Sequence, residues 1–351
     1  MPRLRRVDCA SPGLTRKSSG RGFTYVDAEG SRASAEDVER IRELAIPPAW
    51  QDVWICSDAH GHLQATGVDA VGRKQYIYHP EWRTRRDRQK FDGMLEFAAA
   101  LPALRGEVLK DLRSRGMTRR RVLGCAIRLL DLGFFRVGSE GYAEQNETYG
   151  LATIKRSHVT IESGEIVFDY TAKSGKRRIQ VIADDRVRQI VKELKARRGG
   201  TDELLAYKQG GRWVDVRSTD INAHLKELTG SDFSAKDFRT WNGTVLAAVS
   251  LAGKTDQART KTGRKRAMSE ATKEVAFFLG NTPAVARSSY IDPRVFDRFD
   301  SGWTIAARIE ELGGPDAFID PEGRVALEDA VRDLINDERA SSRALAKVKA
   351  S

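Results

Sequence analysis

Residues 165–182 read EIVFDYTAKSGKRRIQVI, and this stretch interrupts a long run of helical sequence patterns. Apolar residues fall on alternate positions in both halves, as in half-buried strands: Ile166, Phe168 and Tyr170 in the first half, Ile179 and Val181 in the second. The TAKSGK segment between the halves contains a glycine, which can supply the positive φ of a tight turn. The stretch therefore predicts a β-hairpin.

The sequence around this hairpin has apolar residues at helical spacing. Helices are expected over residues 91–101, 105–115, 119–132, 184–197, 219–228, 235–251, 270–279 and 323–337. Residues 90–338 are therefore predicted to form a mainly α-helical domain that contains one β-hairpin, and residues 339–351 to form a frayed polar tail.

The N-terminal part has a different pattern. Short β-like segments at residues 23–26, 53–56, 63–68 and 75–79 are separated by turns with glycine. Ser34 is a candidate N-cap for a helix over residues 35–44, which Pro47 and Pro48 would end. We expect a small antiparallel-sheet domain over residues 21–89, preceded by a basic, flexible arm at residues 1–20. The predicted fold class is α+β.

Composition excludes several classes of protein. The 351 residues include 60 Lys and Arg against 49 Asp and Glu, a net charge of +11, and 40% of them are hydrophobic. A disordered, collagen-like or membrane-spanning chain does not fit these values. Three widely spaced cysteines favour a reducing compartment. The positive charge favours an anionic partner, with nucleic acid first, and a cytoplasmic, nucleoid-associated location.

Two local motifs resemble ligand sites but lack essential parts. Gly253-Lys254-Thr255 matches the end of a phosphate-binding loop, but the glycine expected five residues earlier is Ala248. His60 and His62 have no carboxylate or thiol partner at metal-binding spacing. The sequence therefore predicts neither a metal nor a cofactor.

The remaining candidate residues suit phosphodiester chemistry without a metal. Such a reaction needs a nucleophile, an acid for the departing 5′ oxygen and cations for the charge on phosphorus. Arginine holds two phosphate oxygens with its planar fork, lysine can serve as the acid, and a tyrosine can attack if its pKa is lowered. Local contexts that supply this set occur at Phe135–Gly138, Lys173, Lys236–Trp241 and Ser288–Pro293.

These contexts resemble the poxvirus-like type IB DNA topoisomerases of poxviruses and bacteria. The resemblance extends from about Gly22 to Phe299. It rests on RVG at 136–138 followed by TYGL at 148–151, on KDFRTW at 236–241, on SSYIDP at 288–293 and on DAVGRKQYIYH at 69–79.

The resemblance implies a role for each matching residue. Tyr290 would attack one DNA strand and become linked to its 3′ phosphate, Arg136 and Arg239 would hold the scissile phosphate, and Lys173 would protonate the 5′ oxygen. The fifth family position is usually a histidine, but here it is Asn281. An asparagine can donate an N–H to a phosphate oxygen but carries no charge, so oxyanion binding alone is expected of it.

The resemblance also implies the partner and the conditions of the reaction. Residues expected to contact double-stranded DNA are Gln75, Tyr76, Tyr78, Tyr142 and Lys236. The protein would clamp the duplex as a monomer and relax supercoils without ATP or metal.

Two other functions stay open. Tyrosine recombinases resemble this family in catalytic fold and in their arginine, lysine and tyrosine set, but they exchange strands between two sites. A DNA-packaging protein that performs no chemistry would also be basic. Each candidate residue taken singly can also be an ordinary packing, capping or turn residue; only the whole set, in order, favours catalysis.

Overall fold

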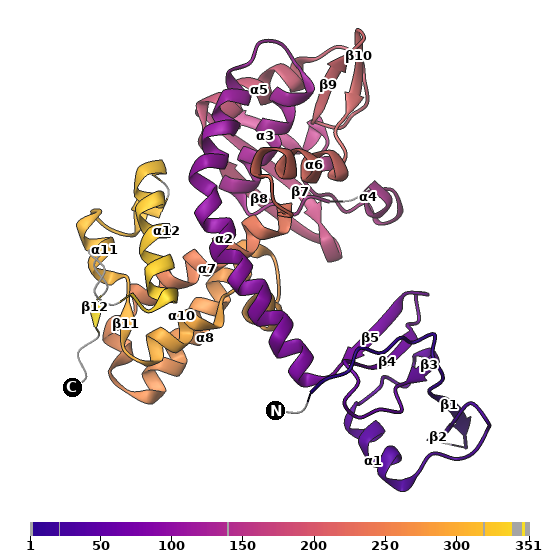
Figure 1. Ribbon diagram of the computed structural model, residues 1–351. Helices are drawn as coiled ribbons and strands as arrows, with labels where there is room; N and C mark the ends of the chain where they lie inside the picture. Colours follow the sequence, from indigo (N-terminus) through magenta and orange to yellow (C-terminus); the bar gives the residue numbers. More distant parts are fainter. Residues whose placement is uncertain (1–2, 21, 139, 319, 339–345, 348–351) are drawn as a thin grey trace. The chain divides into compact units, whose positions relative to one another are not determined.

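The computed structural model divides into two compact units, residues 1–92 and 93–351. It describes residues 3–20, 22–138, 140–318, 320–338 and 346–347 (Figure 1). The boundary between the units falls inside helix α2 (Pro80–Arg113).

The first unit is a five-stranded antiparallel sheet with one helix. The strands are β1 (Leu14–Ser19), β2 (Gly22–Val26), β3 (Gln51–Ile55), β4 (Leu63–Val68) and β5 (Lys74–Tyr78), in the order β2-β1-β3-β4-β5. Helix α1 (Ala35–Glu43) starts where predicted, because Ser34 Oγ accepts the Asp37 N–H at 3.1 Å. Its Ile41 packs in a core with Leu14 and Val53.

Residues 14–19, predicted as part of a flexible arm, instead form strand β1 inside this sheet. Leu14 pairs with Ile55 and is buried, whereas the rest of the strand is polar and largely exposed. Strand β1 is held by backbone hydrogen bonds and has one buried apolar residue. The composition of residues 14–19 therefore did not indicate a strand.

The second unit is mostly helical. Beyond α2 it contains α3 (Arg119–Gly133), α4 (Glu140–Asn146), α5 (Asp185–Ala196), α6 (Ser218–Thr229), α7 (Ala235–Ala252), α8 (Lys261–Leu279), α9 (Pro283–Ser289), α10 (Pro293–Asp300), α11 (Ala306–Glu311) and α12 (Pro321–Asn336). Short 3₁₀ helices are η1 (Leu151–Thr153), η2 (Arg156–His158), η3 (Lys173–Gly175), η4 (Thr255–Arg259) and η5 (Pro315–Phe318). The strands are β6 (Val159–Glu162), β7 (Glu165–Ala172), β8 (Lys176–Ile182), β9 (Ala206–Gln209), β10 (Arg212–Asp215), β11 (Trp303–Thr304) and β12 (Ala346–Lys347).

Two predicted helices, 91–101 and 105–115, are one helix, α2, with Pro102 inside it. A proline removes one helical hydrogen bond. Phe97 and Leu101 before it, and Leu104 and Val108 after it, are all buried, so packing on both sides keeps the helix continuous. In the predicted tail, residues 346–347 pair with β11; residues 339–345 and 348–351 lie outside the described residues.

Helices α3 and α7 form the centre of the second unit, since most of their residues are buried. Helix α3 contacts α5, α6, α7 and the strands β8 and β9, while α7 contacts α8, α10, α11 and α12. In Figure 1 the orange and yellow helices α10, α11 and α12 gather around α7. The large side chains in this core include Trp241, Phe238 and Phe135.

The predicted hairpin is formed by β7 and β8, with β6 as the third strand of the sheet. Ile166, Phe168 and Tyr170 are buried, as expected. The prediction for the second strand was wrong: Ile179 is 57% and Val181 51% exposed. Phe168 pairs with Gln180, and paired residues share a face, so Gln180 and Ile182 of β8 point inward in place of Ile179 and Val181.

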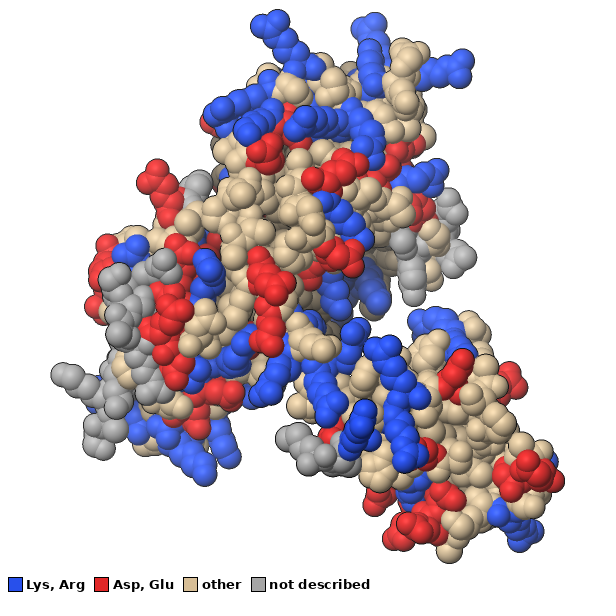
Figure 2. Space-filling view, in the orientation of Figure 1, with Lys and Arg blue, Asp and Glu red and all other residues tan. Residues whose placement is uncertain are grey.

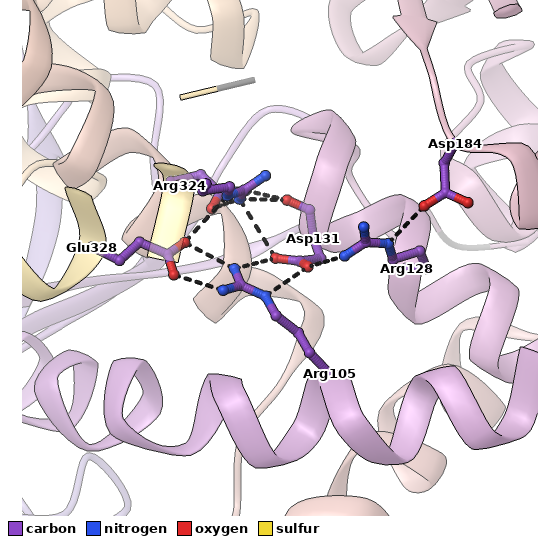
Figure 3. A network of polar contacts seen from close by, with 7 residues as sticks. Arg105, Arg128, Asp131, Asp184, Arg324 and Glu328 are labelled. Atoms are coloured by element: carbon purple, nitrogen blue, oxygen red, sulfur yellow. Dashed lines mark hydrogen bonds and ion pairs between the residues drawn. The ribbon is translucent and has the colours of Figure 1, made fainter. Parts of the chain in front are cut away.

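A buried ionic network joins the helices of the second unit (Figure 3). Arg105 of α2 donates to Asp131 of α3 at 3.0 Å and to Glu328 of α12 at 2.7 Å. Arg324 of α12 donates to the Asp131 carbonyl at 2.7 Å and to Asn242 Oδ1 of α7 at 2.8 Å. The network thus fixes α12 against both central helices.

None of the helices searched in the described part of the chain could span a membrane.

Candidate active site

A cavity of about 290 Å³ opens on the second unit. Its lining residues come from five places along the chain: the segments after α3 and after α4, the hairpin tip, the start of α7 and the end of α9. They are Arg136, Val137, Gly138, Thr148, Tyr149, Lys173, Ala235, Lys236, Arg239 and Tyr290. The fold therefore brings together four of the five predicted catalytic side chains, and Lys236 with them.

Tyr290 is the C-cap residue of α9 and is half-buried. Thr282 caps the start of α9, and Pro283 occupies its first turn. The Tyr290 carbonyl accepts the Thr244 hydroxyl at 3.4 Å, and a Cβ on Gly243 would lie 2.8 Å from that carbonyl oxygen. A glycine at 243 therefore lets α7 approach the backbone of the tyrosine closely.

Arg239 projects from α7 and is 3% exposed. Its Nη2 donates to the Leu279 carbonyl at 2.9 Å, and Nη1 donates to the Phe134 carbonyl. Its Cζ lies 5.2 Å from the centre of the Tyr290 ring. Burial, together with the charge of Arg136, lowers the pKa of Arg239, so this cation is held in an environment where a negative group would stabilise it.

The cations around Tyr290 change its acidity. Burial alone would raise the pKa of the phenol, but the charges of Arg239, Lys236 and Arg136 outweigh burial and lower it. A lowered pKa increases the fraction of phenolate, which is the attacking form. The surroundings of Tyr290 therefore suit a nucleophile.

Arg136 and Asn281 contact each other directly. Arg136 Nη2 donates to Asn281 Oδ1 and, at 3.2 Å, to the Gly280 carbonyl. The Asn281 amide nitrogen is buried and has no hydrogen-bond partner among the described residues. A buried donor without a partner is costly, so this N–H group is available for an oxygen of a bound anion.

Lys173 stands at the tip of the hairpin. Ser174 and Gly175 follow it with φ of 68° and 69°, so the turn needs two positive φ values, one more than the sequence suggested. Lys173 is exposed, lines the cavity and has no ionic or hydrogen-bond partner within the described residues. Its ammonium group is therefore free to meet a ligand.

The other predicted DNA contacts fall elsewhere. Gln75, Tyr76 and Tyr78 lie on β5 of the first unit, where Gln75 donates to Asp69 and the two tyrosine rings stack with centres 6.1 Å apart. Tyr76 is 44% exposed. Tyr142 belongs to α4, but its side chain lies outside the described residues.

Two cavity residues, Thr148 and Tyr149, were not among the predicted site residues. The Tyr149 ring lies 4.5 Å from the ring of His158 and 5.4 Å from the Lys155 ammonium. Their signal was present, because both belong to the TYGL motif at 148–151.

The two incomplete motifs take part in ordinary structure. Lys254 follows α7 and pairs with Glu274 at 2.8 Å, and His62 accepts the Val7 N–H at 3.1 Å. Within the described residues, no three His, Cys, Asp or Glu side chains gather as a metal site would require.

Comparison with known proteins agrees with this geometry. Residues 79–304 match the family of the eukaryotic DNA topoisomerase I catalytic core, and residues 22–69 match the bacterial DNA topoisomerase IB N-terminal domain. The DNA topoisomerase 1B of Acanthamoeba polyphaga mimivirus is 31% identical over 287 residues, covering 80% of this chain and 85% of the viral one.

More distant relatives carry similar names. DNA topoisomerase I of monkeypox virus is 20% identical over 74% of this chain and 81% of its own. DNA topoisomerase 1 of Daucus carota is 26% identical over 57% of this chain and 25% of its own. From the family matches and the extent of the viral similarity, we conclude that the chain belongs to the type IB DNA topoisomerase family.

Proposed function

We propose that this protein relaxes supercoiled duplex DNA by cutting and resealing one strand through Tyr290. The observation that supports this most directly is the single cavity lined by Tyr290, Arg136, Arg239 and Lys173. A nucleophile, two phosphate-binding forks and an ammonium acid are the groups that a metal-independent transesterification needs.

In the cutting step, Tyr290 Oη forms a bond to the scissile phosphorus while the bond from phosphorus to the 5′ oxygen breaks. The phenolic proton leaves to solvent, aided by the lowered pKa of Tyr290. Lys173 donates a proton to the departing 5′ oxygen. Arg136, Arg239 and the free amide of Asn281 donate to the nonbridging oxygens, on which charge accumulates.

Resealing reverses these steps. The 3′ phosphotyrosyl bond replaces one phosphoester by another, so its energy is available for religation and no ATP is required. Between the two steps the free 5′ end swivels, and torsional strain in the DNA drives the rotation.

The duplex is proposed to contact both units, and the protein is proposed to act as a monomer in the cytoplasm, on the nucleoid. The net charge of +11 favours a polyanion, and Figure 2 shows Lys and Arg side chains on the visible face of each unit. Gln75, Tyr76, Tyr78 and Tyr142 are proposed DNA contacts, with Lys236 beside the scissile phosphate. Affinity should fall steeply with salt, by about 0.9 in the log–log slope for each neutralised phosphate.

Relaxation of a supercoiled plasmid in the presence of EDTA tests this function. We expect the wild-type protein to relax the plasmid and to leave a covalent protein–DNA adduct after denaturation. Tyr290→Phe should bind DNA with nearly unchanged affinity but give neither product. Binding without an adduct in the wild type would favour a packaging protein, and strand exchange between two duplexes would favour a recombinase.

A further inference from the structure

The C-terminal end of α8 holds three arginine side chains. The last carbonyl groups of a helix lack partners within the helix and form its negative end. Arg178 donates to the carbonyls of residues 277 and 278, Arg239 to that of residue 279 and Arg136 to that of residue 280. Two of these three arginines line the cavity, whereas Arg178 is not among its lining residues.

Arg178 comes from the hairpin. It lies on β8 opposite Tyr170, five residues after Lys173, so its side chain joins the strand behind the hairpin tip to the end of α8. The Nη1 atom donates to the Phe277 carbonyl at 2.7 Å. Because the guanidinium contacts two successive carbonyls, the hydrogen bonds fix both distance and direction.

Gly280 provides the space for this link. It takes φ of +62° as the C-cap of α8, and a Cβ there would lie 3.3 Å from Arg178 Cδ and 3.4 Å from Cζ. Burial and the nearby charge of Arg136 both lower the pKa of Arg178. Holding the charged guanidinium of Arg178 at this position therefore costs free energy. The carbonyls of α8 offset that cost.

We propose that Arg178 is a positioning residue for strand cleavage: it fixes the hairpin that carries Lys173 to the end of α8 that orients Arg136 and Arg239. This inference rests on the proposed function, since it assigns the distance between the proposed acid and the proposed phosphate-binding groups to one side chain. Without Arg178, the hairpin tip would move relative to the two arginines.

A leaving-group substitution tests this role. Single-turnover cleavage is measured on a duplex with the normal 5′ oxygen at the scissile phosphate and on one with a bridging sulfur there. A thiolate departs without being protonated, since a thiol pKa is about 8.5, so sulfur makes the acid unnecessary. Lys173→Ala provides the reference. It should cleave the oxygen substrate slowly, and its cleavage rate should be largely restored on the sulfur substrate.

We expect Arg178→Ala to resemble Lys173→Ala. Displacement of a catalytic group by an ångström costs about 10²-fold, so cleavage of the oxygen substrate should fall by about that factor, and the loss on sulfur should be at least about tenfold smaller. DNA affinity, measured in a Tyr290→Phe background, should stay within about threefold of the parent, since Arg178 leaves the phosphate untouched. Arg178→Lys keeps the charge and one donor nitrogen. Its cleavage rate on the oxygen substrate should therefore lie between those of Arg178→Ala and the wild type.

Arg177→Ala is the matched control. Arg177 is the preceding residue on the same strand, is 72% exposed and pairs with Asp169 at 2.5 Å, away from α8. Its cleavage rates should equal those of the wild type on both substrates. Should Arg178→Ala unfold, as judged by circular dichroism, Arg178→Lys takes its place in the comparison.

The inference is overturned if Arg178→Ala loses cleavage rate equally on the oxygen and sulfur substrates. It is also overturned if weaker DNA binding accounts for the loss of cleavage by Arg178→Ala, or if Arg177→Ala loses as much cleavage rate as Arg178→Ala. Failure of the proposed function looks different. In that case the wild type forms no adduct, or Tyr290→Phe cleaves as well as the wild type, and both proposals are rejected together.

Discussion

Replacement of Arg239 separates its charge from its shape. Arg239→Gln removes the cation beside Tyr290 but keeps an amide donor, whereas Arg239→Lys keeps the cation and loses the planar fork. In the wild type the cation lies 5.2 Å from the phenol ring centre. Burial raises the pKa of Tyr290, and among the charges that outweigh burial and lower this pKa the largest contribution is that of Arg239.

We therefore expect Arg239→Gln to raise the pKa of Tyr290 and to move the rise of cleavage rate to higher pH. Arg239→Lys should keep the pH profile near that of the wild type. Both variants should also be slower at their optimum by about 10²–10³-fold, because neither side chain reproduces the preorganised guanidinium fork that is proposed to hold the phosphate. The two effects can be separated, because loss of the charge moves the midpoint of the pH–rate profile, whereas loss of the fork lowers its maximum rate.

Single-turnover cleavage between about pH 6 and pH 10, at saturating enzyme, measures both effects, since the profile then reports groups in the bound complex. Tyr290→Phe provides the baseline. An unchanged midpoint for Arg239→Gln would contradict the reasoning, because the cation would then contribute nothing to the acidity of Tyr290. A midpoint that moved equally in Arg239→Lys would attribute the effect to geometry instead of charge.

Two further predictions concern Asn281 and Asp131. Asn281→Ala should slow cleavage by about 10²–10³-fold with little change in DNA affinity, because it removes one donor to the oxyanion; wild-type cleavage by this variant would refute the role. Asp131→Asn should lower the free energy of unfolding at neutral pH by about 3–5 kcal/mol, since it leaves buried arginines without their carboxylate. Burial would raise the pKa of Asp131, but Arg324 and Arg105 outweigh it and lower the pKa well below its usual range. This stabilisation is therefore complete above a pH of about 4 and is lost as pH falls further, so denaturant unfolding of variant and wild type should converge in acid.

The elements that the sequence predicted best are those with strong periodicity. Strand β7 follows its apolar alternation because it buries one face, and α3 follows its apolar pattern because most of its residues are buried. Ile179 and Val181 show the limit of this reasoning. Alternation tells which residues share a face, but pairing with β7 decides which face is buried, and the pairing places Gln180 inside.

The side chains of the candidate site could be predicted from the sequence, whereas the backbone groups that hold them could not. The motifs around Arg136, Arg239 and Tyr290 carry the family resemblance, and the fold places all three in one cavity. Arg239 is held by two carbonyl groups, those of Phe134 and Leu279, which any residue could supply. Such acceptors leave no trace in sequence, because every residue has a carbonyl and only the fold chooses which one is used.

The neutral side chain at position 281 is consistent with the charge around it. Arg136, Arg239, Lys173 and Lys236 already surround the place proposed for one phosphate. A fifth cation would repel them, and its own pKa would fall near so many like charges. An amide avoids this cost: Oδ1 accepts from Arg136, and Nδ2 has no hydrogen-bond partner among the described residues. In the proposed mechanism Asn281 therefore adds a hydrogen bond to the oxyanion while also orienting one of the arginines that binds it.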